Sequence, residues 1–240
     1  MQPEKIPNVS NTLVVIPTPT FTDILQLSTP AYSILACSTL VVDRELGLVN
    51  MMIGIEQENQ YSIKDSVGND IGSIVEKSFS VKDRIVKQIL RTQSPFKADV
   101  LNSYGDVVLK IERPTKWLLN STIIVTECNG NLIGKVKQKW HLYRRRYELV
   151  QHKKPFAKIN GKPWTRNFGI ENESGGKLGL ITRSFSGVIR ELFTNIGVYS
   201  IYMDGTPDLA RPLTLDERAI MLAAAICIDI DYFSQIIRIG

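Results

Sequence analysis

The sequence is poor in the side chains on which most catalytic and metal sites are built. Its 240 residues include only three cysteines, Cys37, Cys128 and Cys227, and two histidines, His141 and His152. The cysteines are too few and too widely spaced for a disulfide framework or a zinc site. The sequence also lacks a G-x-S-x-G nucleophile motif and any paired metal-ligand spacing. These absences argue against a conventional enzyme, and we predict no catalytic residues.

A hydrophobic run long enough to span a bilayer is also missing. The most apolar stretch, AIMLAAAICIDIDYF, is uninterrupted over only ten residues, 219–228, whereas a membrane span needs about 20. Extending the run to that length places Asp229 at its centre, where an Asp costs roughly 2.5–3.5 kcal/mol of insertion free energy. A helix that is apolar all round but does not span is usually buried all round. Since Thr214 and Glu217 form a capping-box pattern, we predict a buried C-terminal helix at about 214–236.

A β-hairpin pattern occurs four times along the chain. An alternating apolar segment, a polar turn with glycine and a second alternating segment occupy residues 61–77, 96–113, 122–139 and 168–183. Each pattern predicts a hairpin, with turns at Gly68, Gly105, Gly130 and Gly176. The glycines are 37, 25 and 46 residues apart, which is too irregular for a propeller or a solenoid. We therefore expect a mainly β fold in which one antiparallel sheet curls into a barrel or sandwich around the C-terminal helix.

The remaining segments give coarser predictions. Residues 1–36, with prolines at positions 3, 7, 17 and 19, form a flexible leader that could contain a first strand, and residues 37–240 form the barrel domain. Residues 78–93 favour a short amphipathic helix, although a strand followed by a loop fits nearly as well. The GVYSIYM stretch at 197–203 favours β structure. The leader has no secretory-signal pattern, so we do not expect secretion. It also has no arginine, which argues against a mitochondrial presequence.

Positive charge is concentrated in one segment. From Lys135 to Arg166 there are eleven Lys and Arg against one acid, whereas the remaining chain has 18 against 23. This distribution indicates an anionic partner, either phospholipid headgroups or nucleic acid, unless the segment is only a solvated basic face. Three consecutive arginines, Arg144 to Arg146, cannot all point into a barrel. The candidate lipid- or anion-binding residues are Lys135, Lys137, Lys139, Arg144, Arg145, Arg146, Lys153 and Lys154.

Several blocks of the sequence resemble those of a known family. The blocks are, in order, NQYSIKDSVG, SPFKADVLNSYGDVVLKIERP, IRELFT and AIMLAAAICIDIDYF. Together they resemble the phospholipid scramblase family over about residues 37–238, and KWHLYRRRYEL, LTLDERA and IDIDYFS resemble its fungal, mitochondria-associated branch. The resemblance implies a Tubby-like closed antiparallel barrel around a buried C-terminal hydrophobic helix. It also implies ATP-independent, bidirectional movement of phospholipids between leaflets, or lipid binding at a membrane surface.

The same resemblance implies partners and a location. We expect anionic phospholipid membranes as the partner, at the mitochondrion or the cytoplasmic face of the plasma membrane, and protein partners at membranes are a further option. A non-transporting membrane adaptor or regulator is the first alternative. A nucleic-acid-binding protein that uses the basic segment 135–158 is the second, although the sequence has no RNP-like aromatic motif.

Calcium is the cofactor that the resemblance implies, and here the sequence departs from the family pattern. The family's acidic metal-binding segment follows the ELFT block, where this chain has NIGVYSIYMDG. Asn195 and Gly197 stand where acids are expected, and Asp204 and Asp208 are the acids that remain nearby. Calcium needs several oxygen ligands, usually including carboxylates. Asp204 and Asp208 are therefore only weak metal candidates.

Overall fold

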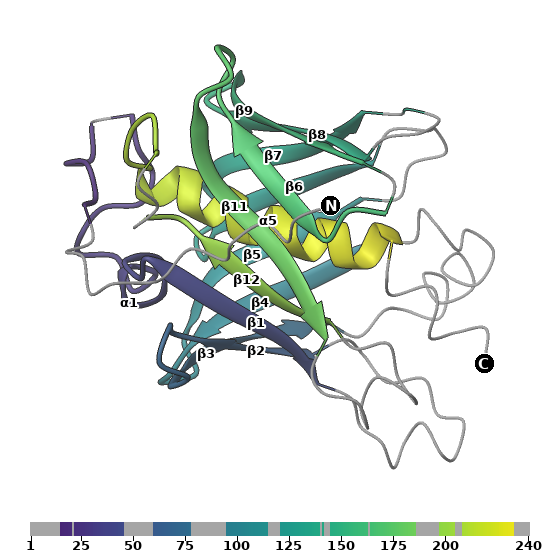
Figure 1. Ribbon diagram of the computed structural model, residues 1–240. Helices are drawn as coiled ribbons and strands as arrows, with labels where there is room; N and C mark the ends of the chain where they lie inside the picture. The colour runs from purple at the N-terminus through teal and green to yellow at the C-terminus, as the bar shows by residue number, and fades with distance from the viewer. Residues whose placement is uncertain are drawn as a thin grey trace, which may run out of the picture.

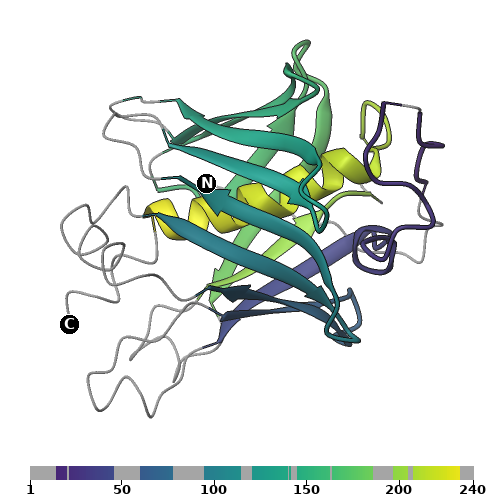
Figure 2. The ribbon, with the colours of Figure 1, turned by 180° about the vertical axis from the view of Figure 1, so that it is seen from behind.

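Twelve antiparallel strands of the described chain form one closed barrel around a long helix, as Figures 1 and 2 show from opposite sides. The computed structural model describes residues 15–20, 22–45, 60–77, 95–114, 121–139, 141, 145–162, 164–185, 197–204 and 208–232. The strands are β1 (Thr39–Glu45), β2 (Gln60–Lys64), β3 (Asp70–Glu76), β4 (Phe96–Asn102), β5 (Val107–Arg113), β6 (Thr122–Glu127), β7 (Leu132–Lys139), β8 (Arg145–Gln151), β9 (Lys154–Gly161), β10 (Asn167–Glu171), β11 (Lys177–Phe185) and β12 (Gly197–Tyr202). Each strand pairs with its neighbour in sequence, and β1 also pairs with β12. The predicted closed antiparallel barrel is confirmed.

Helix α5 (Leu215–Tyr232) runs lengthwise through the barrel (Figure 1). All of its residues up to Ile230 are buried. The predicted capping box begins it, because the Glu217 N–H donates to Thr214 Oγ1 (3.3 Å) and the Thr214 N–H donates to Glu217 Oε2 (3.0 Å). The buried C-terminal helix is therefore confirmed, and residues 233–236 of the prediction lie outside the described residues. Among the residues that the structure describes, no helix is both long and apolar enough to cross a membrane.

Glycines on the barrel wall allow α5 to lie close to the sheet. A Cβ atom at Gly134 of β7 would meet the Ile220 side chain, and one at Gly179 of β11 would meet Met221. This close approach lets the apolar middle of the helix pack densely against the inward side chains of the strands. Because burial of apolar surface is the main favourable contribution to folding, the contact between helix and wall holds the domain together. A larger side chain at either glycine would clash with the Ile220 or Met221 side chain and with a backbone carbonyl of the neighbouring strand.

All four predicted hairpins are present, as β2–β3, β4–β5, β6–β7 and β10–β11. The turns of the first three contain Gly68, Gly105 and Gly130, with φ angles of 94°, 85° and 92°. In the fourth turn the residue with positive φ is Gly175 (86°), one position before the predicted Gly176. Glycine enters this left-handed conformation without steric cost, which explains why the sequence predicts these turns well.

A fifth hairpin, β8–β9, is not predicted by the sequence. Its turn consists of His152 and Lys153, which have φ angles of 46° and 67° although neither is glycine. Two-residue hairpin turns of this kind normally carry Asn-Gly or Asp-Gly, so the sequence offers no signal here. The turn lies at the barrel end where α5 begins, since the His152 ring is near Asp216 in the first turn of the helix.

The described part of the predicted leader, residues 15–20 and 22–36, packs against the same barrel end. Leu25 is buried, and so is Leu35 at the end of the short helix α1 (Tyr32–Leu35). Asp216 of α5 accepts a hydrogen bond from the Leu25 N–H (2.8 Å). These residues contribute to the core, while the domain boundary at residue 37 stays a prediction.

Two other segments of the sequence can be compared with the structure. The GVYSIYM stretch forms β12, as predicted. The predicted amphipathic helix at 78–93 lies outside the described residues.

Candidate functional site

The outer side of strands β7, β8 and β9 carries many of the predicted basic residues. Side chains alternate between the two faces of a strand. In β7, Val136 is buried and Gln138 donates to the hydroxyl of Tyr232 in α5, so the lysines next to them point outward. Five cations lie on the outward face of these strands, and we call this group the basic face: Lys135, Lys137, Lys139, Arg146 and Lys158.

The strand register places the members of the basic face beside one another. Lys139 of β7 is opposite Arg146 of β8. Lys137 is opposite Glu148, which is opposite Lys158 of β9. Directly opposed side chains in a sheet have Cβ atoms about 4.5–5.5 Å apart. The basic segment of the sequence thus becomes a compact surface rather than a linear stretch.

One carboxylate, Glu148, lies within the basic face. Its Oε2 atom is 3.2 Å from Lys139 Nζ and 4.0 Å from Lys137 Nζ. The two lysine side chains are 52% and 41% exposed, so water screens these ion pairs and they contribute little to stability. Five cations against one carboxylate on these strands leave a net positive charge that can attract an anionic surface.

A hollow of about 340 Å³ opens on the basic face next to strand β10. Its volume is near the lower end of the range for small-molecule sites, about 300–1,000 Å³. Arg146 Nε donates to Asn160 Oδ1 (3.3 Å) within the lining. The charged lining residues are Lys139, Arg146 and Lys158 of one sign and Glu148, Glu171 and Glu173 of the other. The hollow can therefore contact both a negative and a positive group.

Arg145 does not belong to the basic face, although the sequence grouped it with its neighbours Arg144 and Arg146. Because it precedes Arg146 on β8, it points to the opposite side of the strand, into the barrel. Its guanidinium carbon lies 4.1 Å from the centroid of the Tyr232 ring. Burial lowers the pKa of this guanidinium group. The alternation of the strand thus corrects its predicted surface position, and Arg144 lies outside the described residues.

Lys153 and Lys154 are exposed but lie apart from the other candidates. Lys153 belongs to the β8–β9 turn and Lys154 is the first residue of β9, at the barrel end where α5 begins. Lys139 and Arg146 lie at the opposite ends of the same strands. The structure therefore brings together four of the predicted candidates and adds Lys158, which the sequence placed in the basic segment but not among the candidates.

The first interior charge cluster surrounds Asp231 near the C-terminal end of α5. Its carboxylate accepts hydrogen bonds from Arg113 Nη1 (2.7 Å) and from the Tyr147 hydroxyl (2.9 Å). Burial raises the pKa of Asp231, and the charge of Arg113 partly offsets that rise. Burial also raises the pKa of Tyr147 well above its usual value, so its hydroxyl stays a donor. Pairing and hydrogen bonds offset the cost of removing these charges from water.

The second interior cluster surrounds Asp229. The hydroxyl groups of Tyr61 and Tyr199 each donate to its carboxylate at 2.9 Å, and Arg44 Nη1 is 3.6 Å away. In the sequence, Asp229 was informative mainly as an obstacle to membrane insertion. Its partners come from strands β1, β2 and β12, far away in sequence, and only the register of the closed barrel brings them to it.

In the described part of the segment for which the resemblance implies calcium, residues 197–204, arginine side chains lie beside the positions in question. Asp204, just after β12, lies 3.4 Å from Arg218 Nη2 and accepts a hydrogen bond from a backbone N–H of the N-terminal segment. A Cβ atom at Gly197 would meet the guanidinium group of Arg183, so a positive charge lies beside that position. Asp208 is exposed. Guanidinium groups repel a cation and occupy carboxylate oxygens, whereas calcium needs several free oxygen ligands.

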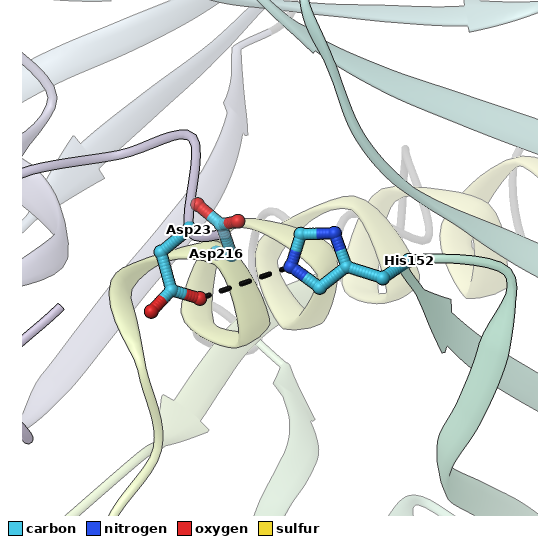
Figure 3. A group of neighbouring side chains, drawn as sticks. All are labelled: Asp23, His152 and Asp216. Carbon is cyan, nitrogen blue, oxygen red and sulfur yellow. Dashed lines mark ion pairs between the residues drawn. The ribbon is translucent and has the colours of Figure 1, made fainter. Parts of the chain in front are cut away.

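Three other side chains with metal-binding atoms, Asp23, His152 and Asp216, meet where α5 begins (Figure 3). Their ligand atoms lie within 4.8 Å of one another, and His152 Nε2 is 3.9 Å from Asp23 Oδ1. Gln151 Nε2 donates to both carboxylates, at 3.0 and 3.2 Å. Burial raises the pKa of Asp216. Since these contacts connect the N-terminal segment, β8 and α5, we interpret the group as structural.

The fold and the site together define a class of protein: an antiparallel barrel that encloses its own C-terminal helix and presents a net positive outer face. The scramblase family model matches residues 19–235, which is most of the chain. The chain belongs to the scramblase family. No solved structure matches it.

Curated relatives from fungi and mammals agree with this assignment. A phospholipid scramblase family protein of Schizosaccharomyces pombe is 35% identical over 246 residues, which cover 90% of this chain and 64% of that protein. Altered inheritance rate of mitochondria protein 25 of Saccharomyces cerevisiae is 34% identical over 239 residues, 85% of this chain and 73% of that protein. Phospholipid scramblase 1 of Mus musculus is 26% identical over 212 residues, 82% of this chain and 61% of that protein. The chain thus spans somewhat less than two thirds of the first and third proteins.

Proposed function

We propose that this protein binds anionic phospholipid membranes through the basic face and moves phospholipids between leaflets without ATP. Family membership supports the substrate class, and the basic face is the observation that carries the binding step. Each Lys or Arg near an anionic membrane contributes about 1 kcal/mol of binding free energy. Five outward cations are therefore enough to hold the barrel on a membrane that contains acidic phospholipids.

The hollow beside β10 supports contact with individual headgroups. Lys139, Arg146 and Lys158 can donate charge-assisted hydrogen bonds to a lipid phosphate. Glu171 and Glu173 can accept hydrogen bonds from an ammonium group of the same headgroup. This arrangement favours headgroups that carry both charges, such as phosphoethanolamine or phosphoserine.

The proposed location is a membrane of the mitochondrion or the cytoplasmic face of the plasma membrane. The name of the Saccharomyces cerevisiae relative, Altered inheritance rate of mitochondria protein 25, supports the mitochondrial alternative. Protein partners at that membrane are part of the same proposal.

The proposed activity does not depend on calcium and uses no catalytic residues. The contact of Asp204 with Arg218, and the position of Arg183 beside Gly197, support calcium independence. Transport would then depend on membrane binding rather than on a metal-driven change of the barrel.

Reconstitution of the full chain into liposomes tests the transport step. The vesicles contain a fluorescent phospholipid in both leaflets, and a membrane-impermeant reductant bleaches the outer leaflet. We expect bleaching to continue into the inner-leaflet lipid at the same rate with calcium and with a chelator. No acceleration in either condition would reject autonomous scrambling. Acceleration only with calcium would contradict the calcium-independent mechanism.

A non-transporting adaptor or regulator at membranes is the second candidate function. The observation that favours it is the filled barrel: α5 is buried up to Ile230 and occupies the interior. Binding to anionic vesicles without lipid movement in the reconstitution assay would select this candidate.

Nucleic-acid binding by the basic segment is tested alongside. Sedimentation with vesicles containing phosphatidylserine is compared with oligonucleotide binding at equal salt, since both depend on ionic strength. We expect the protein to bind the vesicles more strongly than the oligonucleotide. Stronger binding to the oligonucleotide would instead indicate that the basic face binds nucleic acid.

A further inference from the structure

Trp164 is the most exposed large apolar side chain of the described chain, with 93% of its surface accessible. It lies in the connection between β9 and β10. Tryptophan is highly buried on average, because its large ring gains more from removal from water than any aliphatic side chain. An indole that is 93% exposed is therefore a candidate for contact with a partner outside this barrel.

The connection holds Trp164 outward in a defined turn. The Thr165 N–H donates to the Lys162 carbonyl (3.1 Å). The Thr165 hydroxyl donates to the Asn167 carbonyl (2.8 Å) and accepts from the Asn167 N–H (3.1 Å). A Cβ atom at Gly161 would lie 3.0 Å from Thr165 Cγ2, so Thr165 packs closely against the end of β9. These local hydrogen bonds position Thr165, the residue that directly follows the exposed indole.

Positive charge surrounds Trp164 and connects it to the basic face. Lys162 and Arg166 on either side of it are both exposed. Lys162 continues the outward row of β9 that includes Lys158. Asn160, between these two lysines, is opposite Arg146 in the register and bonded to it. The indole therefore stands at one margin of the basic face rather than on a separate surface.

That margin lies at the barrel end where α5 finishes. The strand β9 starts at the turn beside the first residues of α5 and ends at Gly161. Gly161 is opposite Arg145, whose guanidinium group stacks on Tyr232, the last residue of the helix. Trp164 follows Gly161 by three positions. The two ends of the barrel thus differ, and the exposed indole is at the end near Asp231.

We propose that Trp164 inserts into the headgroup region of an anionic phospholipid bilayer and docks the barrel with the C-terminal end of α5 toward the membrane. This inference rests on the membrane binding proposed above. Tryptophan favours the membrane–water interface, where its ring is partly apolar and its N–H stays hydrated. Lys162, Arg166 and the basic face supply attraction to acidic lipids around the inserted ring. Indole insertion and cation contact together fix an orientation that charge alone would leave free.

Fluorescence of Trp164 tests the insertion directly. The chain has three tryptophans, so replacing Trp117 and Trp140 by Phe leaves one reporter. With vesicles of phosphatidylcholine and phosphatidylserine we expect a blue shift of its emission and quenching by lipids brominated near the headgroup. Sedimentation of the protein without a change in emission would overturn the insertion while leaving the membrane binding intact. Absence of sedimentation would instead reject the membrane binding itself.

Substitutions in the otherwise unaltered chain give a second test. Trp164→Ala should weaken binding to these vesicles about tenfold, because interfacial binding scales with the apolar area buried, and Trp164→Phe should restore part of it. The matched control is Tyr104→Ala, since Tyr104 is 88% exposed in the β4–β5 turn at the opposite barrel end. A loss with Tyr104→Ala but not with Trp164→Ala would overturn the proposed orientation. An emission shift with an oligonucleotide but not with vesicles would overturn the lipid assignment.

Discussion

Two regions of this barrel contain clusters of cations, and they differ in what surrounds them. Inside, Arg44 and Arg113 lie against the carboxylates of Asp229 and Asp231, with tyrosine hydroxyls completing the hydrogen bonds. Outside, the basic face places five cations on strands β7 to β9, where the Glu148 carboxylate lies near two of them, Lys137 and Lys139. The interior cations are paired with carboxylates of the same chain. On the outward face of β7 to β9, the cations outnumber the carboxylates.

This difference assigns the two regions to different roles. A buried ion pair that loses one partner leaves a charge without compensation in a region of low dielectric constant. An exposed lysine that is removed costs little, because water and salt already screen it. The interior cations are therefore expected to act on stability, and the outer cations on binding to an anionic surface.

The largest expected effect is the loss of an interior partner. Arg113→Met removes the cation that lies 2.7 Å from Asp231 and should lower the free energy of unfolding by about 3–5 kcal/mol. The control is Lys97→Met, since Lys97 pairs with Glu112 at 3.0 Å but the two side chains are 54% and 47% exposed. That change should cost less than about 1 kcal/mol. Urea denaturation measures the free energy of unfolding of both variants. Equal losses of stability would show that the interior and outer ion pairs do not differ in this respect.

The next largest effect concerns the outer region. Replacing Lys137, Lys139 and Arg146 together by Gln should weaken binding to phosphatidylserine vesicles about 100-fold, since each cation contributes about 1 kcal/mol. The free energy of unfolding should change by less than about 0.5 kcal/mol per site.

A variant with the same loss of charge elsewhere serves as its control. Replacing Lys64, Lys97 and Lys177 by Gln changes strands β2, β4 and β11 instead. We expect that variant to retain most of its vesicle binding in the same sedimentation assay. Similar losses in the two triple variants would show that net charge, and not the basic face, determines binding.

The smallest effect gives the sharpest comparison, because it uses adjacent residues. Arg145→Gln removes the cation above the Tyr232 ring and should destabilise the fold by about 0.5–2 kcal/mol, with vesicle binding unchanged. Arg146→Gln should leave stability unchanged and weaken vesicle binding about fivefold, the equivalent of about 1 kcal/mol. Thermal unfolding and vesicle sedimentation of both variants give the four values. If the two variants behave alike, the inward and outward positions on β8 have no separate roles.

Some parts of the fold are predictable from the sequence because their cause is local. The glycine turns of four hairpins need positive φ angles, which glycine adopts most readily, and the capping box of α5 involves residues three positions apart. The β8–β9 turn is not predictable in this way, because His152 and Lys153 adopt positive φ angles without glycine. There the pairing of the two strands imposes the conformation.

The candidate site also has features that the sequence predicts and features that depend on the tertiary structure. The excess of positive charge between residues 135 and 166 is a property of the sequence, and the binding role of that segment stays a prediction. Which cations share a surface depends on alternation and register, so Arg145 leaves the group and Lys158 joins it. Trp164 also lies in that segment, two positions from both Lys162 and Arg166. An aromatic residue between two cations is the sequence feature that could have identified it as a binding residue.

By itself, the sequence determined the class of structure and the distribution of charge: a barrel of hairpins, a helix too short and too charged at Asp229 to favour a membrane span, and a basic segment. Each follows from residues close together in the chain, through turn geometry, apolar periodicity and charge count. Only the tertiary structure decided the partners of the buried aspartates and the direction of the basic side chains that it describes. Those depend on the closure of twelve strands around α5, which brings together residues as distant as Tyr61 and Asp229.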